Sequence, residues 1–186
     1  MALPEHIKNI QKAKSVEETA SLMKKYLSNV ALESTLEDKA ELVFQINRLK
    51  AEKNAVILGH NYMEPVLFNT VPDHVGDSLE LSRISAKTDA DIIIFCGVKF
   101  MGETAKILNP DKTVLLPAKV AGCSLAAAIS ADEIVELKQQ FPGVPVVSYV
   151  NTYADVKCET DICCTSSNAE KVVSYLFDEG HKRVIF

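Results

Sequence analysis

The chain has 186 residues, of which 47% are hydrophobic and 24% are charged, and its formal net charge is −5. These values are typical of a globular protein with a sizeable core, and an acidic chain without a basic excess is not expected to bind nucleic acid. No apolar run approaches the roughly 20 residues of a membrane-spanning helix, and the N-terminus lacks the apolar segment of a secretory signal. We therefore expect a cytoplasmic protein with no membrane partner.

Two amphipathic helices are predicted first, at residues 5–29 and 34–53, because apolar side chains recur there at helical spacing. Beyond them, short apolar runs alternate with helical patterns. Strands are predicted at residues 55–61, 91–98, 113–118, 144–150, 161–166 and 183–186. Helices are predicted between them at residues 77–88, 99–108, 124–141 and 166–180. Apolar strands that alternate with helices indicate parallel sheets covered on both faces, so the predicted fold class is α/β.

This pattern divides the chain into three parts. The N-terminal helices occupy residues 1–54, a first α/β unit residues 55–122, and a second α/β unit residues 123–186. The sequence stops directly after the strand predicted at 183–186, with no helix to cover that strand. We therefore expect the second unit to be truncated and the chain to be part of a longer protein.

Polar side chains follow two of the predicted strands. His60 and Tyr62 come at the end of the first, and Tyr149 and Asn151 come at the end of the strand at 144–150. Residues two apart in an extended segment face the same side, and ligands of parallel α/β sheets bind at the carboxyl ends of strands. A single pair is more often structural than catalytic, but two pairs at equivalent positions favour a ligand site.

Two helices are predicted to begin with hydroxyl side chains. One begins at Ser78, directly after Asp77, and the other begins around Ser166 in a run of three hydroxyl residues. Capping of the helix N-terminus explains such residues by itself. A serine hydroxyl together with free backbone N–H groups also binds a carboxylate or phosphate, so both interpretations stay open.

Five cysteines in a chain without a secretory signal indicate free thiols or metal ligands. We expect four of them to be structural, because their spacing matches no common metal motif: Cys96, Cys158, Cys163 and Cys164. Cys123 differs, since the stretch KVAGCSLAAAIS places it where a loop turns into a predicted helix, and backbone N–H groups there favour a thiolate. A nucleophile, a metal ligand and a plain cysteine at a helix start all fit this position.

Several stretches, taken in chain order, resemble the quinolinate synthase family from about residue 50 onward. They are ILGHNYMEPV, VGDSLELSRIS, IIIFCGVKFMGETAKIL, VLLPAKVAGCSLA, YVNTYADVK and TSSNA. The run CGVKFMGETAKILNP followed by AGCSLA is long and specific. The resemblance identifies the chain as a member of that family, matching its N-terminal portion.

This resemblance implies a transferase that condenses iminosuccinate with dihydroxyacetone phosphate to quinolinate, the precursor of NAD, with L-aspartate oxidase as the supplier of iminosuccinate. It also implies similar α/β units around a pseudo-threefold axis. The implied cofactor is a 4Fe–4S cluster held by three cysteines, with one iron left open as a Lewis acid.

The resemblance also implies roles for single residues. Cys123 would be the first cluster ligand, and His60 and Tyr62 would line the substrate pocket, with His60 assisting proton transfer. Ser78 and Ser166 would bind substrate carboxylate, while Tyr149 and Asn151 would form the pocket wall that orients the intermediate.

The chain departs from the family in its cluster ligands, because the other two cysteines lie in later segments of a longer chain. Cys158, Cys163 and Cys164 do not match their positions. We therefore expect the chain to be inactive alone. The alternatives are a catalytically incomplete α/β fragment of that enzyme and a thiol redox protein that uses Cys163 and Cys164. The lack of a C-x-x-C motif disfavours the redox protein.

Overall fold

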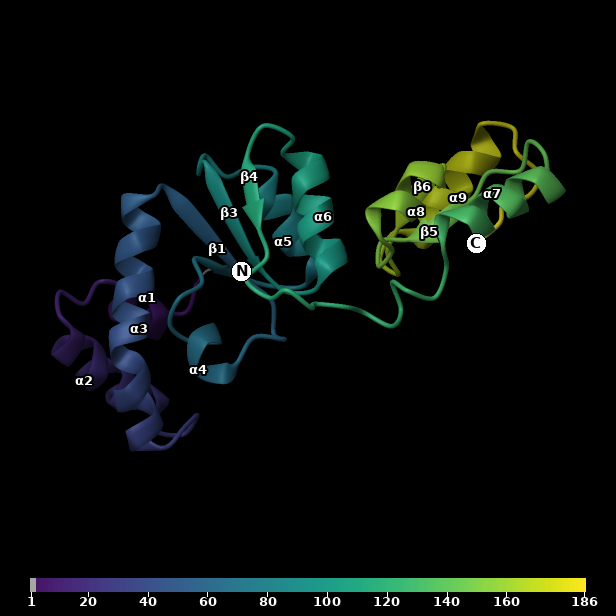
Figure 1. The fold of residues 1–186 in the computed structure, drawn as a ribbon. Helices are drawn as coiled ribbons and strands as arrows, with labels where there is room; N and C mark the ends of the chain where they lie inside the picture. The colour runs from purple at the N-terminus through teal and green to yellow at the C-terminus, as the bar shows by residue number, and fades with distance from the viewer. Residues whose placement is uncertain (1–2) are drawn as a thin grey trace. The chain divides into compact units, whose positions relative to one another are not determined.

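The computed structural model describes residues 3–186 and divides into two compact units. The first unit comprises residues 3–97 and Ala105–Lys119, and the second comprises Val98–Thr104 and Val120–Phe186. Both units pair parallel strands and surround them with helices (Figure 1), which confirms the predicted α/β class. Within residues 3–186, no helix is long and apolar enough to cross a membrane.

The first unit is built on a four-stranded sheet in the order β2–β1–β3–β4, and all of its pairs are parallel. The strands are β1 (Ala55–Gly59), β2 (His74–Val75), β3 (Ile92–Cys96) and β4 (Thr113–Leu115). The helices are α1 (Glu5–Gln11), α2 (Val16–Leu27), α3 (Glu33–Glu52), α4 (Pro65–Phe68) and α5 (Ser78–Ser85), followed by α6 (Lys99–Leu108), which contributes residues to both units.

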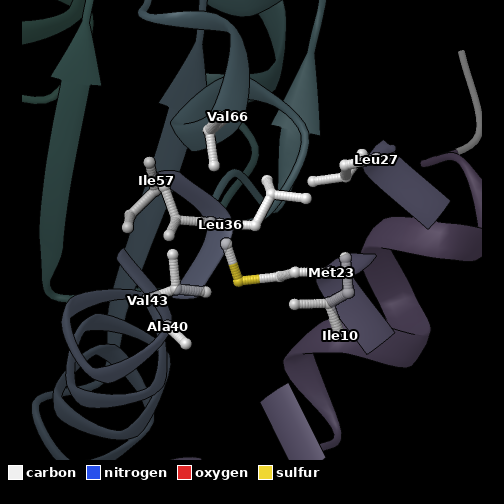
Figure 2. Close-up of a cluster of buried hydrophobic side chains, with 9 residues drawn as sticks. Ile10, Met23, Leu27, Leu36, Ala40, Val43, Ile57 and Val66 are labelled. Atoms are coloured by element: carbon white, nitrogen blue, oxygen red, sulfur yellow. The ribbon is translucent and has the colours of Figure 1, made fainter. Parts of the chain in front are cut away.

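A buried apolar cluster joins the N-terminal helices to one face of this sheet (Figure 2). Met23 of α2 and Leu36 of α3 are each 1% exposed or less, and they pack in one cluster with Ile57 of β1. The opposite face carries Leu58, which alternates with Ile57 along β1 and is fully buried. Helix α5 contacts β1 and β2, so the sheet lies between helices.

The helix predicted at residues 5–29 is wrong as a single element, because α1 and α2 are separated at Lys12–Ser15. The Ser15 side chain accepts a hydrogen bond from the Glu18 N–H at 3.2 Å and so caps the N-terminus of α2. A serine that satisfies an unpaired N–H of the next turn favours a new helix start over continuation. The second predicted helix, at 34–53, is confirmed as α3.

The second unit repeats the alternation of strands and helices. Its elements are α7 (Ala131–Gln140), β5 (Val147–Tyr149), α8 (Ala154–Glu159), β6 (Ile162–Cys164) and α9 (Ala169–Asp178). Strands β5 and β6 are parallel neighbours, and Val147 pairs with Ile162. The strand predicted at 183–186 is reduced to a single parallel bridge between Val146 and Ile185.

The helix predicted at 124–141 begins only at Ala131, because Ser130 forms a capping box with Glu133. The Ser130 hydroxyl accepts from the Glu133 N–H, and the Glu133 carboxylate accepts from the Ser130 N–H at 2.7 Å. Residues 124–127 form a turn instead. The sequence analysis also missed three short elements, α4, β2 and α8, which are too short to show a hydrophobic period.

Candidate functional site

The first candidate site lies at the carboxyl ends of β1 and β2. The chain leaves β1 at Gly59, and the His60 N–H then donates to the Cys96 carbonyl, at the end of β3, at 2.9 Å. From β1 the chain continues to β2 on one side, while β3 pairs on the other side. Ligands of open parallel sheets bind where the strand order reverses in this way.

A cavity of about 280 Å³ opens at this point of the first unit. It is lined by His60, Asn61, Phe68, Val75, Gly76, Asp77 and Glu80. Its polar groups are therefore one imidazole, one carboxamide and two carboxylates. This mixture suits a ligand that offers both hydrogen-bond donors and acceptors.

His60 is the most unusual residue of this cavity. Its side chain is 8% exposed, and among the described residues no partner satisfies its Nδ1 atom. Burial lowers the pKa of His60, and the nearby Asp77 carboxylate opposes that effect. A neutral, buried imidazole with an unsatisfied nitrogen costs free energy until a ligand or water pairs with it.

Tyr62, another predicted residue of the first unit, lies beside His60. The Tyr62 ring lies 4.2 Å from the His60 ring, centroid to centroid, and is 65% exposed. The two rings are therefore neighbours, although β1 ends at Gly59 and both residues belong to the loop that follows it. Their common orientation stays a prediction.

Ser78 is the first residue of α5, as predicted, but Asp77 is the residue that caps this helix. The Asp77 carboxylate accepts from the Glu80 N–H at 2.8 Å. Ser78 follows Asp77 without lining the cavity itself. Sequence reasoning missed Glu80 as a lining residue; its place in the first turn of the GDSLE helix start was the available signal.

Tyr149 and Asn151 share a second cavity, of about 380 Å³, in the second unit. Tyr149 ends β5, and Asn151 follows it by two residues. The remaining lining is mainly apolar and includes Leu125, Ile134 and Phe186. Ser148 and Thr152 line the same cavity, so the prediction that Tyr149 and Asn151 face one side stays a prediction. The mainly apolar surroundings favour an apolar part of a ligand.

Ser166 lies outside that cavity and does not begin a helix, so its predicted place is wrong. The Asn168 carboxamide oxygen accepts from the Thr165 N–H at 2.7 Å and so closes a turn before α9, which begins at Ala169. Ser166 is an exposed residue of this turn. A polar side chain that satisfies the N–H three residues earlier has delayed the helix start.

Cys123 is half-buried in a segment without regular structure, so the prediction that it opens a helix is also wrong. Its N–H lies 3.5 Å from the Tyr153 hydroxyl, a long hydrogen bond, and its carbonyl accepts from the Ala127 N–H at 3.0 Å. One isolated helical turn therefore follows Cys123. Sequence reasoning did not single out Tyr153 as its neighbour.

Three of the other four cysteines have the burial expected of structural residues, and the fourth does not. All five are free thiols, and burial raises the pKa of Cys96 to about 11. Burial also raises the pKa of Cys163 and Cys164. Protonated thiols are poor nucleophiles and poor metal ligands, which disfavours the redox alternative. Cys158, in contrast, is exposed on α8. Its position does not support the predicted structural role, which stays a prediction.

The described residues do not hold a complete metal site. In residues 3–186, no group of three or more His, Cys, Asp or Glu side chains is placed to bind one ion. A 4Fe–4S cluster needs several thiolates, and Cys123 alone does not supply them. This donor set therefore does not fit the implied cluster.

Comparisons with known proteins place the chain among named relatives. The family described as quinolinate synthetase A protein matches residues 44–186. The quinolinate synthase of Caulobacter vibrioides is 57% identical over 148 residues, which cover 79% of this chain and 40% of the relative. That of Sinorhizobium medicae is 61% identical over 137 residues, which cover 74% of this chain and 38% of the relative. The chain thus spans about 40% of the length of the curated relatives it matches.

Proposed function

Because the chain belongs to the quinolinate synthetase A protein family, we propose that it forms part of a quinolinate synthase in NAD biosynthesis. The proposed reaction condenses iminosuccinate, supplied by L-aspartate oxidase, with dihydroxyacetone phosphate to form quinolinate. The structural observation that carries the proposal is the buried His60, which lines the cavity beside α5 and whose Nδ1 has no partner among the described residues.

The start of α5, next to that cavity, supports binding of one carboxylate of the substrate. The first N–H groups of a helix lack intrahelical partners, and Asp77 already takes the Glu80 N–H. The N–H groups of Ser78 and Leu79 are therefore the donors left in the first turn of α5. Together with the Ser78 hydroxyl, and with His60 in the lining of the adjoining cavity, they suit a carboxylate oxygen.

The carboxylates of the same cavity bear on how the substrate is oriented. Asp77 and Glu80 line the cavity and repel a negative group inside it. We expect the imine nitrogen of iminosuccinate, which donates a hydrogen bond, to face these carboxylates. His60 then lies beside the carbon skeleton, where a neutral imidazole can accept or return a proton.

In the second unit, Tyr149 and Asn151 are proposed to orient the intermediate against the apolar lining of their cavity. The Asn151 carboxamide supplies a donor and an acceptor, while the Tyr149 ring supplies an apolar wall. Tyr62 and Ser166 keep their proposed roles as a pocket residue and a carboxylate ligand. Their exposed positions leave both side chains accessible to a ligand.

Cys123 is proposed to supply one thiolate of a 4Fe–4S cluster whose other ligands come from outside residues 1–186. The described residues do not complete that cluster. The same observation favours the second candidate, in which this chain alone is a catalytically incomplete part of the enzyme. After anaerobic reconstitution with iron and sulfide, the chain alone is expected to bind fewer than the about four irons of a cluster and to form no quinolinate.

Binding of quinolinate itself, followed by NMR titration of the chain, tests the proposed site. Shifts are expected at His60 and α5, and His60→Gln is expected to weaken binding about tenfold, the effect of losing a hydrogen bond to a charged group. His181→Gln is the matched control, because His181 is exposed in the second unit. Equal affinity of the two variants, or shifts away from the cavity, would contradict the proposal.

A further inference from the structure

Tyr153 connects three stretches of the second unit that are far apart in the sequence. Its hydroxyl oxygen lies 3.5 Å from the N–H of Cys123, thirty residues earlier. The Lys99 ammonium lies over its ring, 4.9 Å from the centroid. The adjoining Ala154 N–H donates to the Glu103 carboxylate at 2.9 Å. One side chain and its neighbour therefore contact both the Cys123 segment and the start of α6.

The start of α6 also contacts the Cys123 segment directly. The Lys99 N–H donates to the Ala121 carbonyl at 2.7 Å, two residues before Cys123. The Lys99 ammonium also pairs with the Glu103 carboxylate at 3.4 Å. The resulting ring of contacts, here called the Tyr153 network, consists of Lys99, Glu103, Ala121, Cys123, Tyr153 and Ala154.

The segment that carries Cys123 depends on these contacts, because it has no regular structure of its own. Residues 120–123 belong to no helix, strand or turn. Before the turn at 124–127, the backbone of this segment is held by the Ala121 carbonyl and the Cys123 N–H. Both bonds belong to the Tyr153 network. A loop without such bonds samples many conformations, and its side chains then point in many directions.

We propose that Tyr153 is a positioning residue that, with Lys99 and Glu103, fixes the backbone at Cys123 and thereby the direction of its thiol. The proposal rests on the proposed function only in assigning Cys123 a ligand role. Tyrosine is needed because its ring receives the Lys99 ammonium while its hydroxyl reaches the Cys123 N–H. Phenylalanine would keep the ring contact and lose the hydroxyl.

The test uses the chain without iron and measures two properties by peptide-resolved mass spectrometry. These are the hydrogen exchange of the Ala121–Cys123 amides and the rate at which iodoacetamide alkylates Cys123. Tyr153→Phe is expected to speed both about two- to tenfold, the range for loss of one neutral hydrogen bond. Tyr175→Phe is the matched control, because Tyr175 is an exposed residue of α9, and it is expected to change neither property.

Conservative substitutions at Lys99 separate positioning from general stability. Lys99→Met is expected to raise the alkylation rate, and Lys99→Arg, which keeps a cation over the ring, is expected to restore the original rate. Unchanged exchange and alkylation in Tyr153→Phe would overturn the proposal. Faster exchange throughout β5 and β6 would also overturn it, because Tyr153 would then support the whole unit and not the loop.

The results for Tyr153→Phe and for quinolinate binding can be told apart. Quinolinate binding at His60 is tested in the first unit, whereas alkylation reports on Cys123 in the second. If His60→Gln leaves quinolinate affinity unchanged while Tyr153→Phe loosens the loop, the carboxylate site is wrong and the positioning role stands. If the quinolinate site is supported and Tyr153→Phe has no effect, only the positioning role is wrong.

Discussion

The two units repeat one local arrangement, in which an aspartate just before the second strand binds back to the first strand. Asp73 accepts from the Ile57 N–H of β1 at 2.8 Å, and Asp161 accepts from the Val146 N–H beside β5 at 2.8 Å. Each aspartate also pairs with a lysine of the helix that precedes the first strand, Asp73 with Lys50 of α3 at 2.8 Å and Asp161 with Lys138 of α7 at 3.1 Å. The strand registers agree, because Leu58 pairs with His74 as Val147 pairs with Ile162.

Equivalent positions in this common arrangement carry different chemistry. Gly59 approaches Pro72 closely in the first unit, whereas the equivalent Ser148 bonds to Thr160 at 2.8 Å in the second. One residue later, the first unit places the buried His60 and the second places Tyr149, which is 36% exposed. The aspartate and the register therefore define the arrangement, while the residues after each first strand define what it can bind.

The largest expected difference concerns the aspartates. The Lys50 side chain is only 9% exposed and that of Lys138 is 34% exposed. Asp73→Ala leaves a buried ammonium unpaired and is expected to cost the first unit about 3–5 kcal/mol. Asp161→Ala removes an exposed ion pair and one hydrogen bond to a backbone N–H, and it is expected to cost the second unit about 1 kcal/mol of stability. Hydrogen exchange of the β1 and β5 amides measures both losses.

The double variant Lys50→Met, Asp73→Leu serves as the control for that prediction. Replacing both members of a buried pair with apolar side chains avoids the unpaired charge, so much of the lost stability should return. Equal losses for Asp73→Ala and Asp161→Ala would show that burial does not distinguish the two pairs.

A smaller difference is expected at the close contacts. A Cβ added at Gly59 would lie 2.6 Å from Pro72 Cγ, so Gly59→Ala must displace a proline and is expected to cost about 1–3 kcal/mol. Ser148→Ala removes one hydrogen bond and introduces no clash, so it is expected to cost about 1 kcal/mol of stability. Urea unfolding followed by exchange in each unit separates the two. A Gly59→Ala variant as stable as the parent chain would show that the first strand moves freely.

The smallest effect concerns pH. Burial lowers the pKa of His60 below 6.5, against the opposing Asp77 carboxylate, so the unfolded chain binds this proton more readily than the folded chain. The associated stability is present above pH 6.5 and is lost as the pH falls through the folded pKa. Between pH 7 and 5, the β1 amides should lose more protection than the β5 amides, after correction for intrinsic exchange rates.

His60→Gln is expected to remove that extra loss of protection in the first unit. Tyr62, Asp77 and Glu80 are ionisable residues near His60, and they are kept in this variant. If the pH dependence of β1 persists in His60→Gln, another group is responsible. If β1 and β5 respond alike in the parent chain, His60 is not the residue that distinguishes the units at low pH.

Local patterns were sufficient for much of the fold, because they depend on residues close in the sequence. The apolar runs located every longer strand, and the predicted helix at 99–108 is confirmed as α6. Helix starts were less predictable, since Ser15, Ser130 and Asn168 each compete for a nearby N–H group. Such competition is decided by the local geometry that each side chain reaches, which residue type alone does not reveal.

Periodicity and motif order were sufficient for the α/β class, the family and the residues that follow each first strand, because both are contained in the sequence. The tertiary structure shows in addition that, of those residues, His60 is buried and its Nδ1 lacks a partner among the described residues. It also decided that Cys123 lies in a loop beside Tyr153. Burial and contacts between distant residues arise only when the segments pack together, so no local pattern contains them.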